Sequence, residues 1–310
     1  MLLSVYNTLI VHPTYCIVNT NIFAILFLVS KELFMSMPLD LVFVRHGESE
    51  PNVVHSAERA DLLHMAHTEV YERVDWLQRL SGAGVKQAES AGNWLNRHDM
   101  PATEFDRCYA SPFMRARETA LYVGGPDCEW LLDDRIKERD WGEYGATPKQ
   151  VREELFPYSH KNHKTNKWYA RMNGGESLAD NVLMRARDFI GTLQRDMSEK
   201  RVLVVSHGEF MLTMRYLIER MLPEEWLAMD EDAAQEIKNC TIIHYTRQNP
   251  LDQTDIRAHV SWVRIIYPYD EPGSPWKTDW QEVSEKRAVS GRDIATQIDY
   301  SKPLIDRKSQ

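Results

Sequence analysis

The 310-residue chain has few cysteines and no excess of basic residues. Its four cysteines, Cys16, Cys108, Cys128 and Cys240, form no CxxC or similar spacing. This absence argues against a zinc motif or a disulfide framework and favours free thiols in a reducing cytoplasm. With a formal net charge of −9, the chain also lacks the clustered positive charge that non-specific nucleic-acid binding requires. Any phosphate site must therefore be a local cluster of basic residues in an acidic protein.

The chain also lacks an apolar run that could span a bilayer. Residues 22–29 (IFAILFLV) are uninterrupted but too short, and no Lys or Arg precedes them as in a signal peptide. Met35 and Met37 stand just before the first convincing strand, and either could start translation. Residues 1–36 are therefore a dispensable extension, a membrane tether or a real core element. We favour the first, and predict a cytoplasmic protein without stable membrane insertion.

Strand and helix patterns alternate from residue 39 onward. Apolar runs typical of buried strands cover residues 40–44, 106–110 and 201–206, and two closing strands at the sheet edge are expected at 240–247 and 258–267. Helices are predicted for residues 84–97, 111–122, 150–155, 177–196 and 209–221, and those at 84–97 and 177–196 are amphipathic. For the helix at 111, Ser111 is the expected N-cap. This order predicts an α/β fold, namely a three-layer α/β/α sandwich with a mostly parallel central sheet and an inserted helical cap.

The chain divides into three parts. Residues 1–36 are a non-core N-terminal extension, and residues 37–268 are the main domain. Within it, the charged stretch 53–80 has helical periodicity and is interpreted as the cap that lies over the site. Residues 269–310 are rich in Pro, Trp and charge without clear periodicity, which predicts a surface-wrapping or mobile C-terminal tail.

Two of the predicted strands end in His-Gly. In open α/β sheets the ligand crevice lies beyond the carboxyl ends of the strands, so Arg45, His46 and His207 share one crevice if their strands are neighbours. Phosphoryl transfer needs a nucleophile, positive charge around the phosphate oxygens and an acid for the leaving alkoxide. An imidazole such as His46 can take a phosphoryl group and release it to water. Arg45 and Arg115 can grip phosphate oxygens in fork geometry, and a protonated His207 would add a donor.

Four blocks of the sequence resemble the histidine phosphatase superfamily, in its phosphoglycerate mutase-like branch. Residues 44–52 (VRHGESEPN) resemble its RHGES-x-x-N signature, and residues 111–120 (SPFMRARETA) its S-x-x-x-R-A-x-x-T-A helix start. Residues 137–142 (KERDWG) are similar to its acid segment, and residues 204–208 (VVSHG) to its second histidine motif. The blocks occur in the family's order, so the resemblance spans residues 40–267.

The resemblance implies a phosphatase that hydrolyses phosphate monoesters of a small molecule through a phosphohistidine, with residues 37–268 as its histidine phosphatase domain. It implies no metal and no cofactor. The implied catalytic residues are His46 as phospho-acceptor, Glu138 as general acid, and His207; the implied phosphate- and substrate-binding residues are Arg45, Asn52 and Arg115. Taken singly, each has an ordinary structural interpretation, but four matching blocks in order make a coincidence implausible. The rival acids are Glu48, Glu58 and Asp61.

Two other functions remain as alternatives: phosphoglycerate mutase-type phosphoryl transfer, and a non-catalytic regulatory module of the same fold. Mutases of this type carry a tyrosine shortly after the acid and a pair of adjacent arginines further on. This chain has Trp141 in the first place and no Arg-Arg pair in residues 161–171. Hydrolysis is therefore favoured. Specificity is expected in residues 53–80 and 156–172, where His160 and His163 are predicted to lie in a solvated loop; the pattern does not indicate an oligomeric state.

Overall fold

The protein is described by a computed structural model that covers residues 36–60, 69–269, 278–283 and 288–297. Its centre is a seven-stranded sheet in the order β3-β2-β4-β1-β5-β8-β9. The strands are β1 (Asp40–Arg45), β2 (Arg107–Ala110), β3 (Leu131–Leu132), β4 (Arg201–Ser206), β5 (Ile242–Thr246), β8 (Trp262–Ile266) and β9 (Gln281–Glu282). A separate hairpin joins β6 (Gln248–Asn249) and β7 (Asp252–Ile256).

The sheet is mixed, with a parallel core. Strands β3, β2, β4 and β1 run parallel, whereas β5, β8 and β9 each run antiparallel to the preceding neighbour. The α/β fold predicted from the sequence is confirmed. Strand β5 was expected at the edge but lies inside the sheet, next to β1. The described edge on that side is β9, which comes from the predicted tail; a two-residue strand has no periodicity by which a sequence could reveal it.

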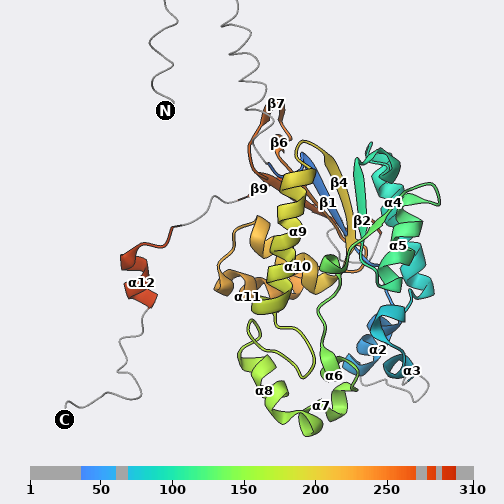
Figure 1. The fold of residues 1–310 in the computed structure, drawn as a ribbon, viewed down its shortest axis with the longest axis vertical. Helices are drawn as coiled ribbons and strands as arrows, with labels where there is room; N and C mark the ends of the chain where they lie inside the picture. Colours follow the sequence, from blue (N-terminus) through green and yellow to red (C-terminus); the bar gives the residue numbers. More distant parts are fainter. Residues whose placement is uncertain (1–35, 61–68, 270–277, 284–287, 298–310) are drawn as a thin grey trace, which may run out of the picture.

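Helices cover both faces of the sheet, which gives the three predicted layers (Figure 1). On one face α4 (Gly82–Arg97) and α5 (Met114–Gly124) pack against Val42 and Val44 of β1. On the other face α9 (Leu183–Asp196), α10 (Gly208–Ile218) and α11 (Pro223–Glu231) pack against Leu41 and Phe43. Alternate residues of one buried strand thus serve two cores, as expected for a strand covered on both sides.

Two helical stretches of chain lie together below the sheet in Figure 1, and we refer to them together as the cap. The first contains α2 (Glu50–Arg59), α3 (Glu69–Glu72) and the 3-10 turn η2 (Asp75–Leu77); the second contains α6 (Gly142–Gly145), α7 (Lys149–Leu155) and α8 (Pro157–Thr165). Buried Glu58 joins them, because its carboxylate accepts hydrogen bonds from Tyr71 Oη (2.6 Å) and the Lys149 backbone N (2.9 Å). Only the first stretch was predicted as cap.

The remaining elements are short. They are the 3-10 turns η3 (Ala102–Glu104), η4 (Asp134–Ile136) and η6 (Ala233–Gln235), the π-helical turn η5 (Leu178–Val182) and α12 (Gly291–Gln297). In the part of the chain that the structure describes, no helix is long and apolar enough to cross a membrane.

We expect a chain that begins at Met37 to keep its activity and most of its stability. Residues 1–35 lie outside the described residues, and the described contacts begin with Ser36 Oγ and Met37 O, which both accept from Arg247 Nη1 (2.7 and 3.1 Å). Loss of Ser36 removes three hydrogen bonds of its hydroxyl, to Arg247, to Ser198 Oγ (2.6 Å) and to Glu199 Oε1 (3.0 Å), each worth about 1 kcal/mol. Thermal unfolding of the full-length chain and of chains that begin at Met35 and Met37 measures this. A melting temperature of the Met35 chain far below that of the full-length chain would instead place the apolar run 22–29 in the core.

Candidate active site

Two histidines meet at the carboxyl ends of the parallel strands. Because Arg45 of β1 pairs in register with Ser206 of β4, His46 and His207 follow side by side. Their ring centroids are 5.0 Å apart with an interplanar angle of 60°. Both residues are buried, with 3% of His46 and none of His207 exposed. The fold therefore brings both predicted histidines to one place in the sheet.

The hydrogen bond of His46 determines which ring nitrogen is free to react. Its Nδ1 lies 2.7 Å from the carbonyl oxygen of Gly47. Since a carbonyl only accepts, Nδ1 carries the proton and Nε2 keeps its lone pair. Burial, followed by the charges of Arg115 and Arg45, holds the pKa of His46 well below its ordinary value. The ring is thus neutral at physiological pH, as a nucleophile must be.

His207 is also neutral in the free protein. Burial, followed by the charges of Arg115 and Arg45, holds its pKa well below the ordinary value. Its Nε2 is bonded to Ser111 Oγ at 2.7 Å, and its buried Nδ1 has no partner among the described residues. The protonated His207 considered from the sequence is therefore not the resting form. The neutral ring can still donate from Nδ1 when the Ser111 hydroxyl donates to Nε2.

Ser111 does not cap a helix, contrary to the prediction. Helix α5 begins at Met114 with Phe113 at the N-cap, while Ser111 Oγ bonds His207 instead. The Phe113 ring meets the His207 ring edge-on at 5.2 Å. Neither contact was found from the sequence. The only signal in the sequence was that Ser111 directly follows the predicted strand at 106–110. The structure shows that this strand, β2, pairs with β4.

The two arginines supply the positive charge of the site. Arg45 is partly buried; its Nη1 donates to Ile237 O at 2.5 Å, while its buried Nε has no partner within the described part of the chain. Arg115 has a side chain that is 5% exposed, and its Nη1 donates to both the carbonyl oxygen (2.8 Å) and Oδ1 (2.9 Å) of Asp75 in the cap. Asp75 was missed because no sequence motif links η2 to α5.

Asp75 offers a test of how the cap tunes the charge of Arg115. We expect Asp75→Asn to tighten the binding of inorganic phosphate on the order of tenfold, or about 1.4 kcal/mol, because the negative charge is lost while an oxygen still orients Arg115. Asp75→Ala should weaken phosphate binding, because the side-chain acceptor is removed. Isothermal titration of both variants with phosphate measures these effects. Weaker binding in both would assign Asp75 a positioning role alone.

Asn52 is oriented by its carbonyl oxygen. Its Oδ1 accepts from the Ser49 backbone N (3.1 Å), from Ser49 Oγ (2.9 Å) and from Asn239 Nδ2 (3.1 Å). The amide nitrogen of Asn52 is therefore the group left to donate to a ligand. Asn239 Nδ2 also donates to the carbonyl oxygen of His46 at 3.0 Å, so it braces both residues. Asn239 precedes β5 in a loop without a motif, and the sequence did not reveal it.

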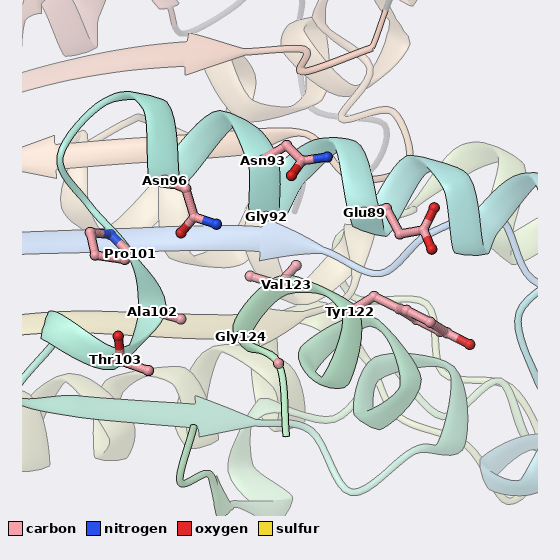
Figure 2. A pocket seen from close by; sticks show the side chains of 11 residues that line it. Glu89, Gly92, Asn93, Asn96, Pro101, Ala102, Thr103, Tyr122, Val123 and Gly124 are labelled. Atoms are coloured by element: carbon pink, nitrogen blue, oxygen red, sulfur yellow. The ribbon is translucent and has the colours of Figure 1, made fainter. Parts of the chain in front are cut away.

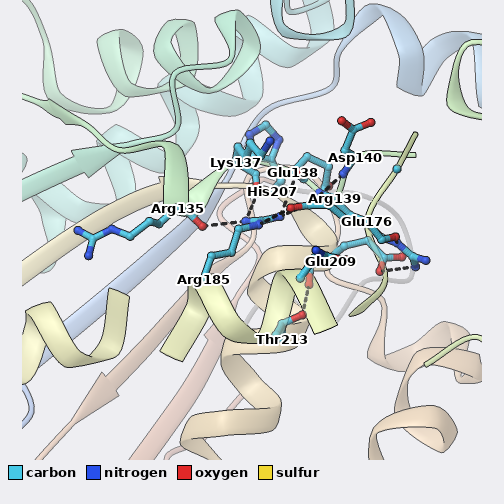
Figure 3. Close-up of polar contacts among 12 residues, drawn as sticks. Arg135, Lys137, Glu138, Arg139, Asp140, Glu176, Arg185, His207, Glu209 and Thr213 are labelled. Atoms are coloured by element: carbon cyan, nitrogen blue, oxygen red, sulfur yellow. Dashed lines mark hydrogen bonds and ion pairs between the residues drawn. The ribbon is translucent and has the colours of Figure 1, made fainter. Parts of the chain in front are cut away.

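Glu138 lies in the loop after η4, where an arginine from α9 holds the backbone (Figure 3). Arg185 Nη1 donates to two carbonyl oxygens of this loop at 2.7 Å each, and its Nη2 donates to the Glu138 carbonyl at 3.2 Å. Arg185 is itself paired with Glu176 at 3.0 Å. The half-buried Glu138 carboxylate accepts from the Arg139 backbone N at 2.9 Å. Burial lowers the pKa of Arg45, and the charge of Glu138 opposes this shift, so Glu138 belongs to the same electrostatic cluster.

The rival acids proposed from the sequence are not placed equally. Glu58 is bound within the cap, as described above, and Glu48 accepts from Ser81 Oγ at 2.5 Å. Asp61 lies outside the described residues. His160 and His163 were predicted to lie in a solvated loop, but they lie in α8. They are partly buried there, because His160 bonds Tyr144 Oη (3.0 Å) and His163 packs on Trp141.

No metal-binding cluster occurs among the described residues, and a groove on the protein does not coincide with the candidate site residues. Within the described ranges, no three His, Cys, Asp or Glu side chains could together hold a metal ion. Figure 2 shows a groove of about 430 Å³ along α4 and the end of α5, lined by residues such as Asn93, Asn96 and Tyr122. No candidate site residue lines this groove.

Comparison with known proteins decides the family. Residues 41–250 match the histidine phosphatase superfamily (branch 1). The chain belongs to this superfamily. The resemblance drawn from the four sequence blocks is thereby confirmed.

Curated relatives of this chain are distant. The 2,3-bisphosphoglycerate-dependent phosphoglycerate mutase of Methylorubrum populi is 28% identical over 187 residues, which cover 58% of this chain and 79% of that protein. The phosphoglycerate mutase-like protein AT74 of Arabidopsis thaliana is 25% identical over 214 residues, with coverages of 66% and 62%.

Solved structures share the fold. The alpha-ribazole phosphatase of Shigella flexneri has a TM-score of 0.53 at 18% identity and covers 71% of this chain and 95% of its own. Mycobacterial glucosyl-3-phosphoglycerate phosphatase has a TM-score of 0.51 at 20% identity, with coverages of 71% and 96%. At these identities the likeness concerns the fold alone.

Proposed function

We propose that this histidine phosphatase hydrolyses phosphate monoesters of a small molecule through a phosphohistidine on His46. One observation carries the proposal: His46 is buried and neutral, and its free Nε2 shares a site with His207 and two arginines. Arg45 Nε and His207 Nδ1 support it, since both are buried without a partner in the described residues. Buried polar atoms are rarely left unpaired, and phosphate oxygens would satisfy both.

The residues suggest a two-step reaction. His46 Nε2 attacks phosphorus, the P–O bond to the leaving group breaks, and Glu138 gives its proton to the departing alkoxide. Water then attacks the phosphohistidine while the Glu138 carboxylate takes its proton, which releases inorganic phosphate and restores both groups. Throughout, the guanidinium groups of Arg45 and Arg115 and the Nδ1 proton of His207 stabilise charge on the phosphate oxygens.

Hydrolysis is preferred to phosphoglycerate mutation because the basic residues of the expected specificity region are already engaged or exposed. Lys167 forms an ion pair with Asp230, and Arg171 Nε donates to a backbone carbonyl at 2.9 Å. Lys164 is exposed on α8. A mutase must bind a small carboxylated substrate and keep water from the phosphohistidine. These basic side chains do not form a binding site for a substrate carboxylate. Mutase-type phosphoryl transfer remains the alternative because the curated relatives are named as phosphoglycerate mutases or mutase-like proteins.

Assays with three kinds of substrate test the proposal. We expect phosphate release from p-nitrophenyl phosphate and from some members of a panel of metabolite phosphates. We also expect no interconversion of 2- and 3-phosphoglycerate, with or without 2,3-bisphosphoglycerate. Interconversion faster than phosphate release would establish the mutase alternative. Binding of phosphate without turnover of any substrate would identify a non-catalytic module.

A further inference from the structure

The loop that carries Glu138, residues 135–140 (the acid loop), is held by the side chain of Arg185, which is 12% exposed (Figure 3). A guanidinium has five N–H groups in a rigid fork, and Arg185 makes five hydrogen bonds. Nη1 donates to Arg135 O and Lys137 O (2.7 Å each), Nη2 to Glu138 O (3.2 Å) and Glu176 Oε2 (3.0 Å), and Nε to Glu176 Oε1 (3.1 Å). The guanidinium is therefore fully engaged by the acid loop and Glu176.

Glu176 supports the other end of the acid loop. Besides its pairing with Arg185, its Oε2 accepts from the Asp140 backbone N at 3.0 Å, and its own backbone N donates to Asp140 O at 2.7 Å. Its carbonyl oxygen accepts from Arg139 Nε at 3.0 Å. Arg185 thus binds the loop up to Glu138, and Glu176 binds the two residues that follow.

An unusual turn directs Arg185 toward the acid loop. Its helix is preceded by the π-helical turn η5, in which Val182 N donates to Ser177 O, five residues back, at 3.2 Å. Such a turn contains one residue more than an α-helical turn, is rare, and is frequent at functional sites. Because each residue of an α-helix rotates the chain by about 100°, Arg185 would point about 100° away without the extra residue.

The position of the Glu138 carboxyl group depends on this loop. Among the described residues, the hydrogen bond that it accepts comes from the Arg139 backbone N, which belongs to the loop itself (2.9 Å). Arg139 is fixed in turn, because its Nη1 forms an ion pair with Glu209 (3.8 Å) and its Nη2 donates to Ala170 O (2.7 Å). A general acid must reach the leaving oxygen at hydrogen-bond distance, and a misplacement of about 1 Å can cost on the order of a hundredfold in rate. Proton transfer is therefore the step most sensitive to displacement of the acid loop.

We propose that Arg185 is the positioning residue of the general acid: its guanidinium, together with Glu176, fixes the acid loop so that the Glu138 carboxyl group lies at the leaving-group oxygen. This role rests on the proposed phosphatase function. Arg185 acts through Glu138 and does not contact the substrate. Attack of His46 on a substrate whose leaving group needs no proton is therefore independent of Arg185.

The test compares kcat/KM of the wild type, Arg185→Ala and Arg185→Lys with an alkyl phosphate and with p-nitrophenyl phosphate. This parameter covers the steps up to release of the leaving group, so hydrolysis of the phosphohistidine, which both substrates share, does not enter. For Arg185→Ala we expect a loss on the order of a hundredfold with the alkyl phosphate and little change with p-nitrophenyl phosphate. Arg185→Lys should show the same selective loss, because one ammonium group cannot replace the planar fork.

Combination with Glu138→Gln shows whether Arg185 acts through the acid. In that background Arg185→Ala should cost the alkyl phosphate nothing further, because the proton donor is already absent. Losses that multiply in the double variant would assign Arg185 to another group and overturn the inference. Equal slowing of both substrates by Arg185→Ala and Arg185→Lys would show a general structural role and also overturn it. So would a Glu138→Gln variant that slows both substrates equally, since there would be no acid to position.

Arg187→Ala is the matched control, because Arg187 is an exposed arginine on the same helix. It should leave kcat/KM for both substrates unchanged. Thermal unfolding of each variant is measured beside the assay. Arg185→Lys keeps a positive charge beside Glu176, so it serves as the test if Arg185→Ala does not fold. Wild-type alkyl phosphate hydrolysis by a folded Arg185→Lys would overturn the inference.

Failure of this inference differs from failure of the proposed function. A wild type that releases phosphate from p-nitrophenyl phosphate and forms phosphohistidine, with Arg185 variants that slow both substrates equally, refutes the role of Arg185 alone. A wild type that does neither refutes the proposed function, and the role of Arg185 falls with it.

Discussion

His46→Ala is expected to abolish turnover of every substrate. No neighbouring group can replace the phospho-acceptor, because the adjacent ring of His207 uses its Nε2 to bond Ser111. Loss of a nucleophile that works as a unit with its pocket can cost on the order of a millionfold in kcat. The direct measurement is phosphate on the protein that is acid-labile and base-stable after a rapid quench with labelled substrate.

The matched control for His46→Ala is His259→Ala, which removes an exposed histidine outside the site. The control should form phosphoprotein at the wild-type level, and the site variant should form none. Phosphoprotein at the wild-type level in His46→Ala would place the nucleophile on another residue. Because His46 is buried at the carboxyl end of β1, its replacement could also affect folding. Thermal unfolding of each variant should therefore be measured beside the assay.

Glu138→Gln should slow the phosphorylation of His46 by alkyl phosphates far more than by p-nitrophenyl phosphate. An alkoxide is a poor leaving group that needs a proton, whereas nitrophenolate leaves without one. General acid catalysis of this kind is worth about a hundred- to ten-thousand-fold, and this is the expected loss for alkyl substrates alone. Rapid-quench measurement of phosphohistidine formation with both substrates gives the comparison.

Equal slowing of both substrates would make Glu138 a positioning residue. The search for the acid would then turn to Glu209, which faces the same Arg139, and to Asp61, which lies outside the described residues. Glu58 is a poor replacement, because Tyr71 and the Lys149 backbone already occupy its carboxylate.

Several parts of the site follow from short stretches of sequence. A buried strand that ends in His-Gly carries its own signal, since apolar periodicity and the motif lie within a few residues of one another. The placement of His46 and His207 then needed that β1 and β4 be neighbours, which the sequence left open and the structure shows. The same local logic predicted α4, α9 and the closing strands β5 and β8.

Other parts depend on contacts that join distant stretches of chain. Asp75 meets Arg115 across 40 positions, and Asn239 meets His46 across 193. Such pairs share no sequence motif. Each pair forms because the packing of the flanking helices and strands determines where a loop lies. The same holds for Ser111, whose local pattern indicates a helix cap although its hydroxyl bonds His207, which follows another strand.

By itself the sequence determined the five longer strands of the central sheet, the two histidine turns and the family, because these are encoded by residues close together in the chain. Only the tertiary structure decided the protonation of the site. His46 and His207 are neutral because burial and two arginines act on them together. Burial and the distance between charges are properties of the packed protein, so no pattern of residues along the chain could reveal them.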